Sequence, residues 1–356
     1  MAGNSDDPRA QLVEAISWQA SGCRPLGCPF YEALCEEMAR AVGHDGPAWS
    51  VLQPFAAASR DAAYVLRLLA GIHRLVLTGD APNIAAHYPS AGGDGDAKAA
   101  MAAINELLED PPGAIHEALA RPPQTNEVGR SIALASGLLV IANETGLPLR
   151  LREIGSSGGL NLRLDSYWYE QGGRGWGDPT SPIRFVDLWR GGGPPFERGA
   201  VVAERVGCDQ NPIDVTTPEG AVTLLSYVWP EPAERFIRLR DAIGLARGLP
   251  VRIDRADAAS WLPDQLVPRI GTALVVLHSV VWQYLDGSTA TALETAIGSA
   301  GAAASPSAPV AWLRLEPNPR TYAPAELTLS LWSGGAPSER LLATSGFHGG
   351  ALTWCS

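Results

Sequence analysis

The chain has 356 residues, of which 46% are hydrophobic and 18% charged, so it can build a sizeable core. Its 27 Lys+Arg and 38 Asp+Glu give a net charge of −11, which disfavours nucleic acid and anionic membrane surfaces as partners. Lys98 is the only lysine, which excludes a Walker A loop and a lysine-bound pyridoxal phosphate. No apolar stretch is long enough for a transmembrane helix, and the polar start is unlike an export signal, so we expect a cytoplasmic protein.

The five cysteines are odd in number, and the long chain has no export signal, so we expect reduced thiols and no disulfide framework. Cys23, Cys28 and Cys35 lie close together in the sequence, but no histidine follows them at the spacing of a zinc finger. We therefore expect no metal site.

Residues 1–147 are predicted to form a helical N-terminal cap region. Apolar residues recur there every three or four positions, and Pro, Gly and Asp clusters separate the segments. The expected helices are Phe30–Ala41, Ala62–Leu77, Met101–Leu108 and Val128–Glu144. No strand is expected before residue 148.

The pattern changes at residue 148, where Leu149–Ile154 reads as a strand that runs into a glycine turn. Further apolar runs alternate with helical patterns, and a Gly-, Trp- and Pro-rich insertion interrupts them at about 166–199. The runs are Ala200–Val206, Pro250–Ile253, Ala273–Leu277 and Val310–Leu315, with helices at Ala233–Arg247 and Ser288–Ile297. Residues 148–356 therefore predict an α/β, Rossmann-like, doubly wound and mostly parallel sheet. Alternation around Leu329 and a return at Leu341–Ala343 predict a C-terminal antiparallel hairpin.

The loop after the first predicted strand reads Glu153-Ile154-Gly155-Ser156-Ser157-Gly158-Gly159. Ligands of doubly wound sheets bind beyond the carboxyl ends of the strands, and small residues let a ligand approach the backbone. Glu153, at the strand end, could meet an amine or a hydroxyl. The alternative is a plain strand-to-helix turn.

Polar residues also follow three later strands. Asp209 ends the second strand and suits ribose hydroxyls, and Asp257 with Ala258 follows the third, where a carboxylate can accept from an adenine amino group. His278 ends the fourth strand and is a candidate general base or orienting donor. Because parallel strands end at one edge, these groups are expected to gather there.

The Glu-x-Gly-x-x-x-Gly loop with these two acids resembles the class I S-adenosylmethionine-dependent methyltransferases. More closely, five segments resemble a bacterial family catalogued as a domain of unknown function, over nearly the whole chain. The segments are Thr125–Arg130, Glu153–Leu162, Trp176–Pro179, Gly207–Asp209 and Val228–Glu231.

The methyltransferase likeness, which covers about 149–345, implies S-adenosylmethionine as cofactor and a small-molecule substrate. It makes Glu153, Gly155, Ser157 and Gly159 the cofactor loop, although Ser157 replaces the usual middle glycine. It also implies that Asp209 binds ribose and that Asp257 and Ala258 bind the adenine edge.

Substrate contacts are expected from Arg163, Asp178 and Tyr284, although Arg163 could instead form a surface ion pair and Asp178 could cap a turn. The sequence leaves the methyl acceptor and the oligomeric state open.

Two other functions fit the same residues. Gly155–Gly159 also reads G-x-S-x-G, so Ser157 could be the nucleophile of a serine hydrolase, with Asp257 or Asp286 and His278 or His348 as partners. The absence of predicted strands before residue 148 argues against that fold. The chain could also be a non-catalytic ligand-binding or regulatory module.

Overall fold

The computed structural model describes residues 7–58, 63–231 and 233–355. The chain forms two compact units. The first, the helical unit, runs to Thr125 and takes in Thr217–Arg240, whereas the second, the sheet unit, comprises Asn126–Thr216 and Asp241–Ser356. The boundary between the units lies after Thr125, earlier than the predicted boundary at residue 147. The helix that precedes the first strand belongs to the sheet unit. Among the described helices, none has the length and apolar character of a membrane span.

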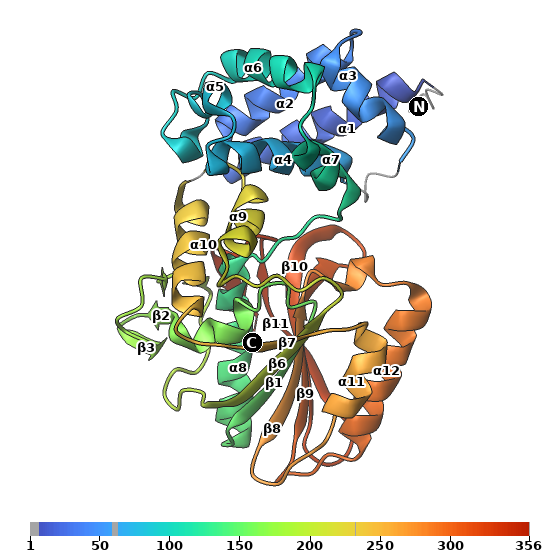
Figure 1. Cartoon of the computed structure of the whole chain (residues 1–356). Helices are drawn as coiled ribbons and strands as arrows, with labels where there is room; N and C mark the ends of the chain where they lie inside the picture. The colour runs from blue at the N-terminus through green and yellow to red at the C-terminus, as the bar shows by residue number, and fades with distance from the viewer. Residues whose placement is uncertain (1–6, 59–62, 232, 356) are drawn as a thin grey trace. The chain divides into compact units, whose positions relative to one another are not determined.

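The helical unit is built from short helices around one apolar core (Figure 1). Its helices are α1 (Pro8–Cys23), α2 (Pro29–Val42), α3 (Pro47–Leu52), α4 (Tyr64–Thr78), α5 (Pro82–Ala85), α6 (Ala97–Glu109), α7 (Gly113–Ala120) and α9 (Pro218–Ser226). The predicted period holds in α2, α4 and α6, where Leu34, Leu68 and Ile104 are fully buried. Ala62, the predicted start of the second helix, lies outside the described residues, and α1, α7 and α9 were not predicted.

The segment 217–240 returns to the helical unit between two strands of the sheet. His73 of α4 lies with Nδ1 3.2 Å from the carbonyl of Ser226 at the end of α9. Glu231 accepts a hydrogen bond from the backbone N–H of Phe30, and Trp229 packs against the same core. The motif Val228–Glu231 therefore anchors this segment.

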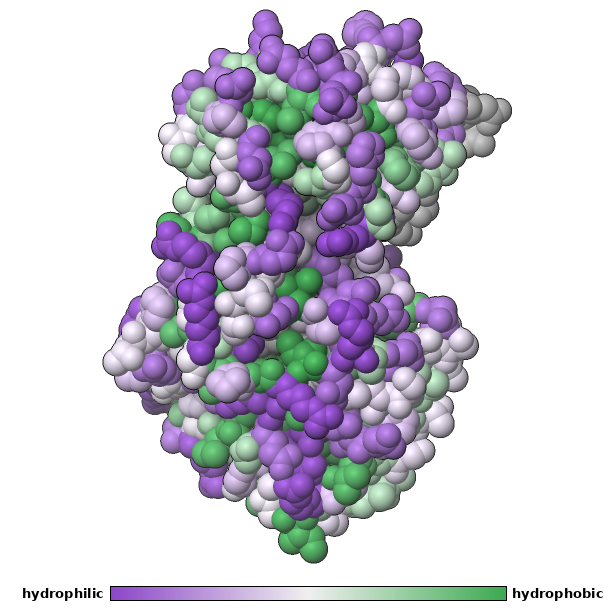
Figure 2. Space-filling view, in the orientation of Figure 1, coloured by the Kyte–Doolittle hydropathy of each residue, from purple (hydrophilic) through white to green (hydrophobic). Residues whose placement is uncertain are grey.

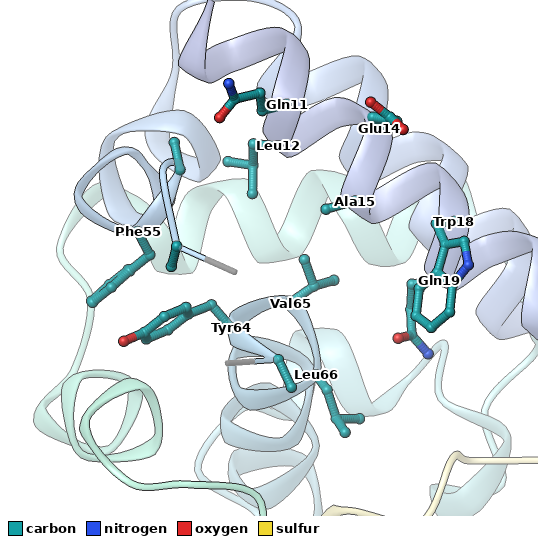
Figure 3. A pocket seen from close by; sticks show the side chains of 13 residues that line it. Gln11, Leu12, Glu14, Ala15, Trp18, Gln19, Phe55, Tyr64, Val65 and Leu66 are labelled. Atoms are coloured by element: carbon teal, nitrogen blue, oxygen red, sulfur yellow. The ribbon is translucent and has the colours of Figure 1, made fainter. Parts of the chain in front are cut away.

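Cys23, Cys28 and Cys35 are buried free thiols. A hydrogen bond with Cys35, together with burial, raises the pKa of Cys23, and burial raises the pKa of Cys28 to about 12. Thiols of this kind are unreactive. Figure 3 shows a pocket in the same unit between α1 and α4, lined by Trp18, Tyr64 and others.

The sheet unit holds a nine-stranded sheet in the order β5-β12-β11-β10-β9-β8-β1-β6-β7. Its strands are β1 (Leu149–Ile154), β5 (Trp189–Arg190), β6 (Val202–Asp209), β7 (Arg252–Arg255), β8 (Ala273–Ser279), β9 (Val310–Asn318), β10 (Tyr322–Trp332), β11 (Ser338–Ser345) and β12 (Leu352–Trp354). The five strands from β7 to β9 pair in parallel in the doubly wound order 3-2-1-4-5, which confirms the predicted fold class.

Helices cover both faces of this sheet. Leu313 of β9 packs on Gly137 of α8 (Ser131–Thr145), whereas its neighbour Trp312 points to the other face. There Trp312 joins a cluster with α11 (Ala258–Gln265) and α12 (Gly287–Ala302). The predicted helix at Ala233–Arg247 is α10 (Ala233–Ala246), which crosses from one unit to the other at Arg240.

The predicted C-terminal hairpin is present, because β10 pairs antiparallel with both β9 and β11. The insertion at 166–199 forms a separate three-stranded sheet of β2 (Trp168–Gln171), β3 (Arg174–Gly177) and β4 (Arg184–Val186). It also supplies β5, which pairs in parallel with β12 at the edge of the main sheet. These short strands were not predicted.

Candidate functional site

The candidate site lies where the strand order reverses, at the carboxyl end of β1. This strand pairs in parallel with β6 on one side and β8 on the other. Glu153 therefore stands between Gly207 and Leu277, near the ends of all three strands. Crevices of this kind hold the ligands of doubly wound folds.

The glycine loop turns sharply at this point. Gly155, Ser157 and Gly159 have φ values of 69°, 50° and 66°, in the left-handed region that a serine rarely adopts. The N–H of Ser157 donates to Asp209 Oδ2 at 2.8 Å, so the loop is tied to the end of β6. The glycine loop is therefore in contact with Asp209, the acid predicted to bind ribose.

Both glycines are also required by close packing. A Cβ on Gly155 would lie 2.4 Å from Val281 Cγ2, and one on Gly159 would lie 2.8 Å from Ile253 Cδ1. Val281 therefore fills the space beside Gly155, and Ile253 fills the space beside Gly159.

Glu153 is the most perturbed carboxyl group of the site. It is 2% exposed, and its Oε2 has no hydrogen-bond partner among the described residues. Burial, with a smaller contribution from the negative charge of Asp209, outweighs the opposing effects of Ser156, Arg163 and Arg130 and raises the pKa of Glu153 to about 8. The Oγ of Ser157 is likewise buried without a partner in the described part of the chain. Two unsatisfied polar atoms in one loop indicate a ligand site.

Asp209 and Asp257 differ in their availability. Asp209 is half-buried and accepts from the backbone of Ser157 and, at 2.8 Å, of Asn211. Asp257 is exposed and caps α11 by accepting from the N–H groups of Ala259 and Ser260. Asp257 therefore has a structural role, and buried Ala258 opens the helix behind it.

His278 lies at the predicted strand end but is fully buried, with both ring nitrogens engaged. Trp312 Nε1, which can only donate, lies 3.0 Å from His278 Nε2, so this nitrogen is the acceptor. The other nitrogen, Nδ1, then carries the proton and donates to Glu316 Oε1 at 2.6 Å. Because no lone pair is left for a substrate, the geometry favours the orienting role over the general base.

Glu316 of β9, which the sequence analysis did not single out, organises the loop after β8. Its carboxylate accepts from His278 and from the backbone N–H groups of Val281 and Trp282. Val280 has φ of 53°, a strained value for a β-branched residue. Glu316 thus holds a strained turn whose next residue, Val281, packs on Gly155.

The segment 126–130, part of one of the five family-like motifs, also reaches the site. Asn126 Oδ1 accepts from the N–H of Leu160, just after the glycine loop, at 2.9 Å. Arg130 donates to the carbonyls of Ser279 and Phe347, and Glu127 lies 3.4 Å from His348. The part of this motif from Asn126 to Arg130 therefore ties the glycine loop, the end of β8 and the C-terminal segment together.

The predicted substrate residues do not gather. Arg163 is buried and donates to the carbonyls of Gly158, Gly159 and Leu249, so it braces the loop. Asp178 is exposed and caps a turn at Thr180, as its alternative reading predicted. Tyr284 follows β8 and is 69% exposed, within reach of solvent but without a described contact to the loop.

The described edge carries the acids Glu153, Asp209 and Glu316, and the positive charges of Arg130 and Arg163 act on Glu153. No group of three or more His, Cys, Asp or Glu side chains in the described part of the chain is arranged to hold a metal ion. A buried carboxyl group with an unsatisfied oxygen favours a ligand that brings a positive charge or an N–H or O–H donor.

Comparison with known proteins identifies a family for this chain but no activity. No curated protein and no solved structure matches the chain. Residues 13–354 match the family described as uncharacterized protein conserved in bacteria (DUF2332). Since this match covers nearly the whole chain, the protein belongs to that bacterial family, as the five motif segments predicted.

Proposed function

We propose that the sheet unit binds S-adenosylmethionine at the carboxyl end of β1 and uses it to methylate a small molecule. The observation that carries the proposal is the buried, unpartnered Oε2 of Glu153 beside the Ser157–Asp209 hydrogen bond, at the point where the strand order reverses. A carboxyl group in this state gains a partner when a cation or an N–H or O–H donor arrives.

The residues present fit this cofactor in their donor and acceptor chemistry. Glu153 would accept from the ammonium group, Asp209 from ribose hydroxyls, and the surroundings of Asp257 and Ala258 would meet the adenine edge, as the resemblance implies. When bound, the cofactor supplies a methyl group on a sulfonium, whose positive charge suits the acidic edge. The chain's own contribution is alignment of the two reactants and exclusion of water.

Titration calorimetry of the full chain with S-adenosylmethionine and S-adenosylhomocysteine tests the proposal. We expect micromolar binding that Glu153→Gln and Asp209→Asn each weaken by about tenfold or more, the loss of one charge-assisted hydrogen bond. Asp178→Asn, which alters an exposed turn, is the matched control and should bind like the unmodified protein. No binding to the folded, unmodified chain would refute the cofactor assignment. Binding without turnover on any acceptor would favour a regulatory module.

A serine hydrolase is the second candidate, favoured by one observation. Ser157 has the positive φ of a strained elbow, and its buried Oγ lacks a partner among the described residues. The missing partner also counts against a serine hydrolase. A nucleophilic serine is activated by a hydrogen-bonded base, and none of the described histidines bonds to Ser157 Oγ. A fluorophosphonate probe should label the chain at Ser157 if it is a nucleophile, and Ser157→Ala should abolish labelling while Ser156→Ala keeps it.

A further inference from the structure

A cluster of three arginines and one glutamate lies near the amino-terminal ends of β1 and β6. Arg150 and Arg152 alternate with apolar neighbours along β1 and share one face of the sheet. Glu204 of β6 pairs in register with Arg150 and takes both guanidinium groups on Oε2, at 2.9 and 3.1 Å. Arg269, in the loop before β8, binds the other carboxylate oxygen. We refer to Arg150, Arg152, Glu204 and Arg269 as the arginine cluster.

The two strand arginines are unusually buried for cations. Arg150 is 3% and Arg152 5% exposed. Arg150 Nη1 donates to the carbonyl of Val267 at 2.8 Å, and Arg152 Nη1 to that of Leu151 at 2.9 Å. The Nε of Arg152 is buried and has no partner among the described residues. One donor of the cluster is thus left unsatisfied, which is rare in a folded protein.

The charges of the cluster do not balance. Three guanidinium groups meet one carboxylate, which leaves a surplus of two positive charges. This imbalance shifts the pKa values of both partners. Burial and the neighbouring Arg150 and Arg269 lower the pKa of Arg152. The three arginines lower the pKa of Glu204 to about 2. Two of the three cations, Arg150 and Arg152, are buried, and buried positive charge that one carboxylate does not balance is costly and is stabilised by an anion.

We infer that the arginine cluster is a binding site for a small, multiply charged oxyanion of the phosphate class. Guanidinium groups bind such anions through paired N–H donors, and their rigid fork suits the tetrahedral oxygens. The members that reach solvent are Arg269 and Glu204, whose side chains are 60% and 34% exposed, so an anion would approach from their side. In Figure 2, hydrophilic residues form a band across the middle of the visible face of the sheet unit, and hydrophobic residues lie at its lower end.

This site is separate from the proposed cofactor site. Arg150 and Arg152 lie on the face that carries α11 and α12, with Ile154. Glu153, one residue on from Arg152, points to the opposite face because side chains alternate along a strand. Anion binding here therefore does not depend on the proposed methyl transfer.

Calorimetric titration of the full chain with inorganic phosphate, against sodium chloride at equal ionic strength, tests the site. We expect saturable binding of one phosphate that chloride does not reproduce. Arg269→Gln removes an exposed donor, so the fold should persist while the affinity falls about tenfold or more. Arg252→Gln is the matched control, since Arg252 lies on the next strand, is similarly exposed and pairs only with Asp254 in the described contacts.

A second variant distinguishes an anion site from a purely structural ion network. Glu204→Gln removes the only carboxylate and raises the positive surplus, so an anion site should bind phosphate more tightly. If the cluster is only a structural ion network, Glu204→Gln will lower stability without any dependence on phosphate. Heat no greater than that of chloride, or binding that Arg269→Gln leaves intact, overturns the inference.

Discussion

His278 Nδ1 lies 2.6 Å from Glu316 Oε1, while Trp312 fixes the opposite nitrogen of the same ring. These hydrogen bonds hold Glu316 in place near the carboxyl ends of the parallel strands, where the candidate site lies. Glu316 in turn accepts from the backbone of Val281, which packs against Gly155. A buried histidine thus acts on the glycine loop through two intermediates and without touching it.

The first prediction concerns Glu316. Glu316→Gln replaces a carboxylate that accepts from an imidazole and two backbone N–H groups, so we expect it to lower the free energy of unfolding by about 1.5–3 kcal/mol. Urea unfolding at pH 7 measures this loss. Glu326→Gln is the control, because Glu326 stands opposite Glu316 on β10 and takes one amide hydrogen bond from Asn318. Equal losses in the two variants would contradict the positioning role.

The second prediction separates backbone strain from packing at Gly155. Gly155→Ala should cost about 1–2 kcal/mol for the left-handed backbone and about 1–3 kcal/mol more for the clash with Val281. Gly172→Ala has a similar φ of 57° but no atom within 4 Å of its Cβ, so it should show the backbone cost alone. Adding Val281→Ala to Gly155→Ala should recover part of the difference in chemical denaturation. A similar cost in both single variants would show that Val281 does not press on the loop.

The third prediction concerns His73 in the helical unit. Burial lowers the pKa of this histidine from 6.5 to about 4, so the unfolded chain binds more protons between these values. Stability is therefore complete above pH 6.5 and is lost as the pH falls towards 4. His73→Gln should flatten this part of the curve relative to the unmodified chain in urea unfolding, whereas exposed His116→Gln should not.

The local parts of the site could be predicted from the sequence. Alternation and the following glycines gave β1 its correct bounds, Leu149–Ile154, and the apolar run before His278 placed that residue at a strand end. Both signals lie within a few residues of the position they describe. They report backbone periodicity and turn chemistry, which are local properties.

The long-range parts could not be predicted in this way. Glu316 lies one residue beyond the apolar run that marked β9, and only the register of β8 with β9 brings it to His278. The same holds for residues 217–240, whose sequence carries no sign that they join the helical unit. Pairing of that kind depends on contacts far apart in the chain, and a single sequence does not specify them.

The last prediction follows from the raised pKa of Glu153. Its carboxyl group takes up a proton with a pKa of about 8 in the folded chain, against 4.5 ordinarily, so the folded state binds more protons between these values. The stability that Glu153 contributes is thus present below pH 4.5 and falls as the pH rises towards 8, by at most about 1.4 kcal/mol per pH unit. Glu153→Gln, which stays neutral, should lack this decline.

Urea unfolding of both proteins from pH 5 to pH 9 checks this. The free energy of unfolding of Glu153→Gln should gain on that of the unmodified chain up to about pH 8 and then run parallel to it, because Glu153 is ionised above that value. Comparing the two cancels other groups that titrate in the same range, such as exposed histidines. Parallel curves over the whole range would mean that Glu153 is already ionised at pH 5. Its unpartnered oxygen would then need a positive partner in the folded chain.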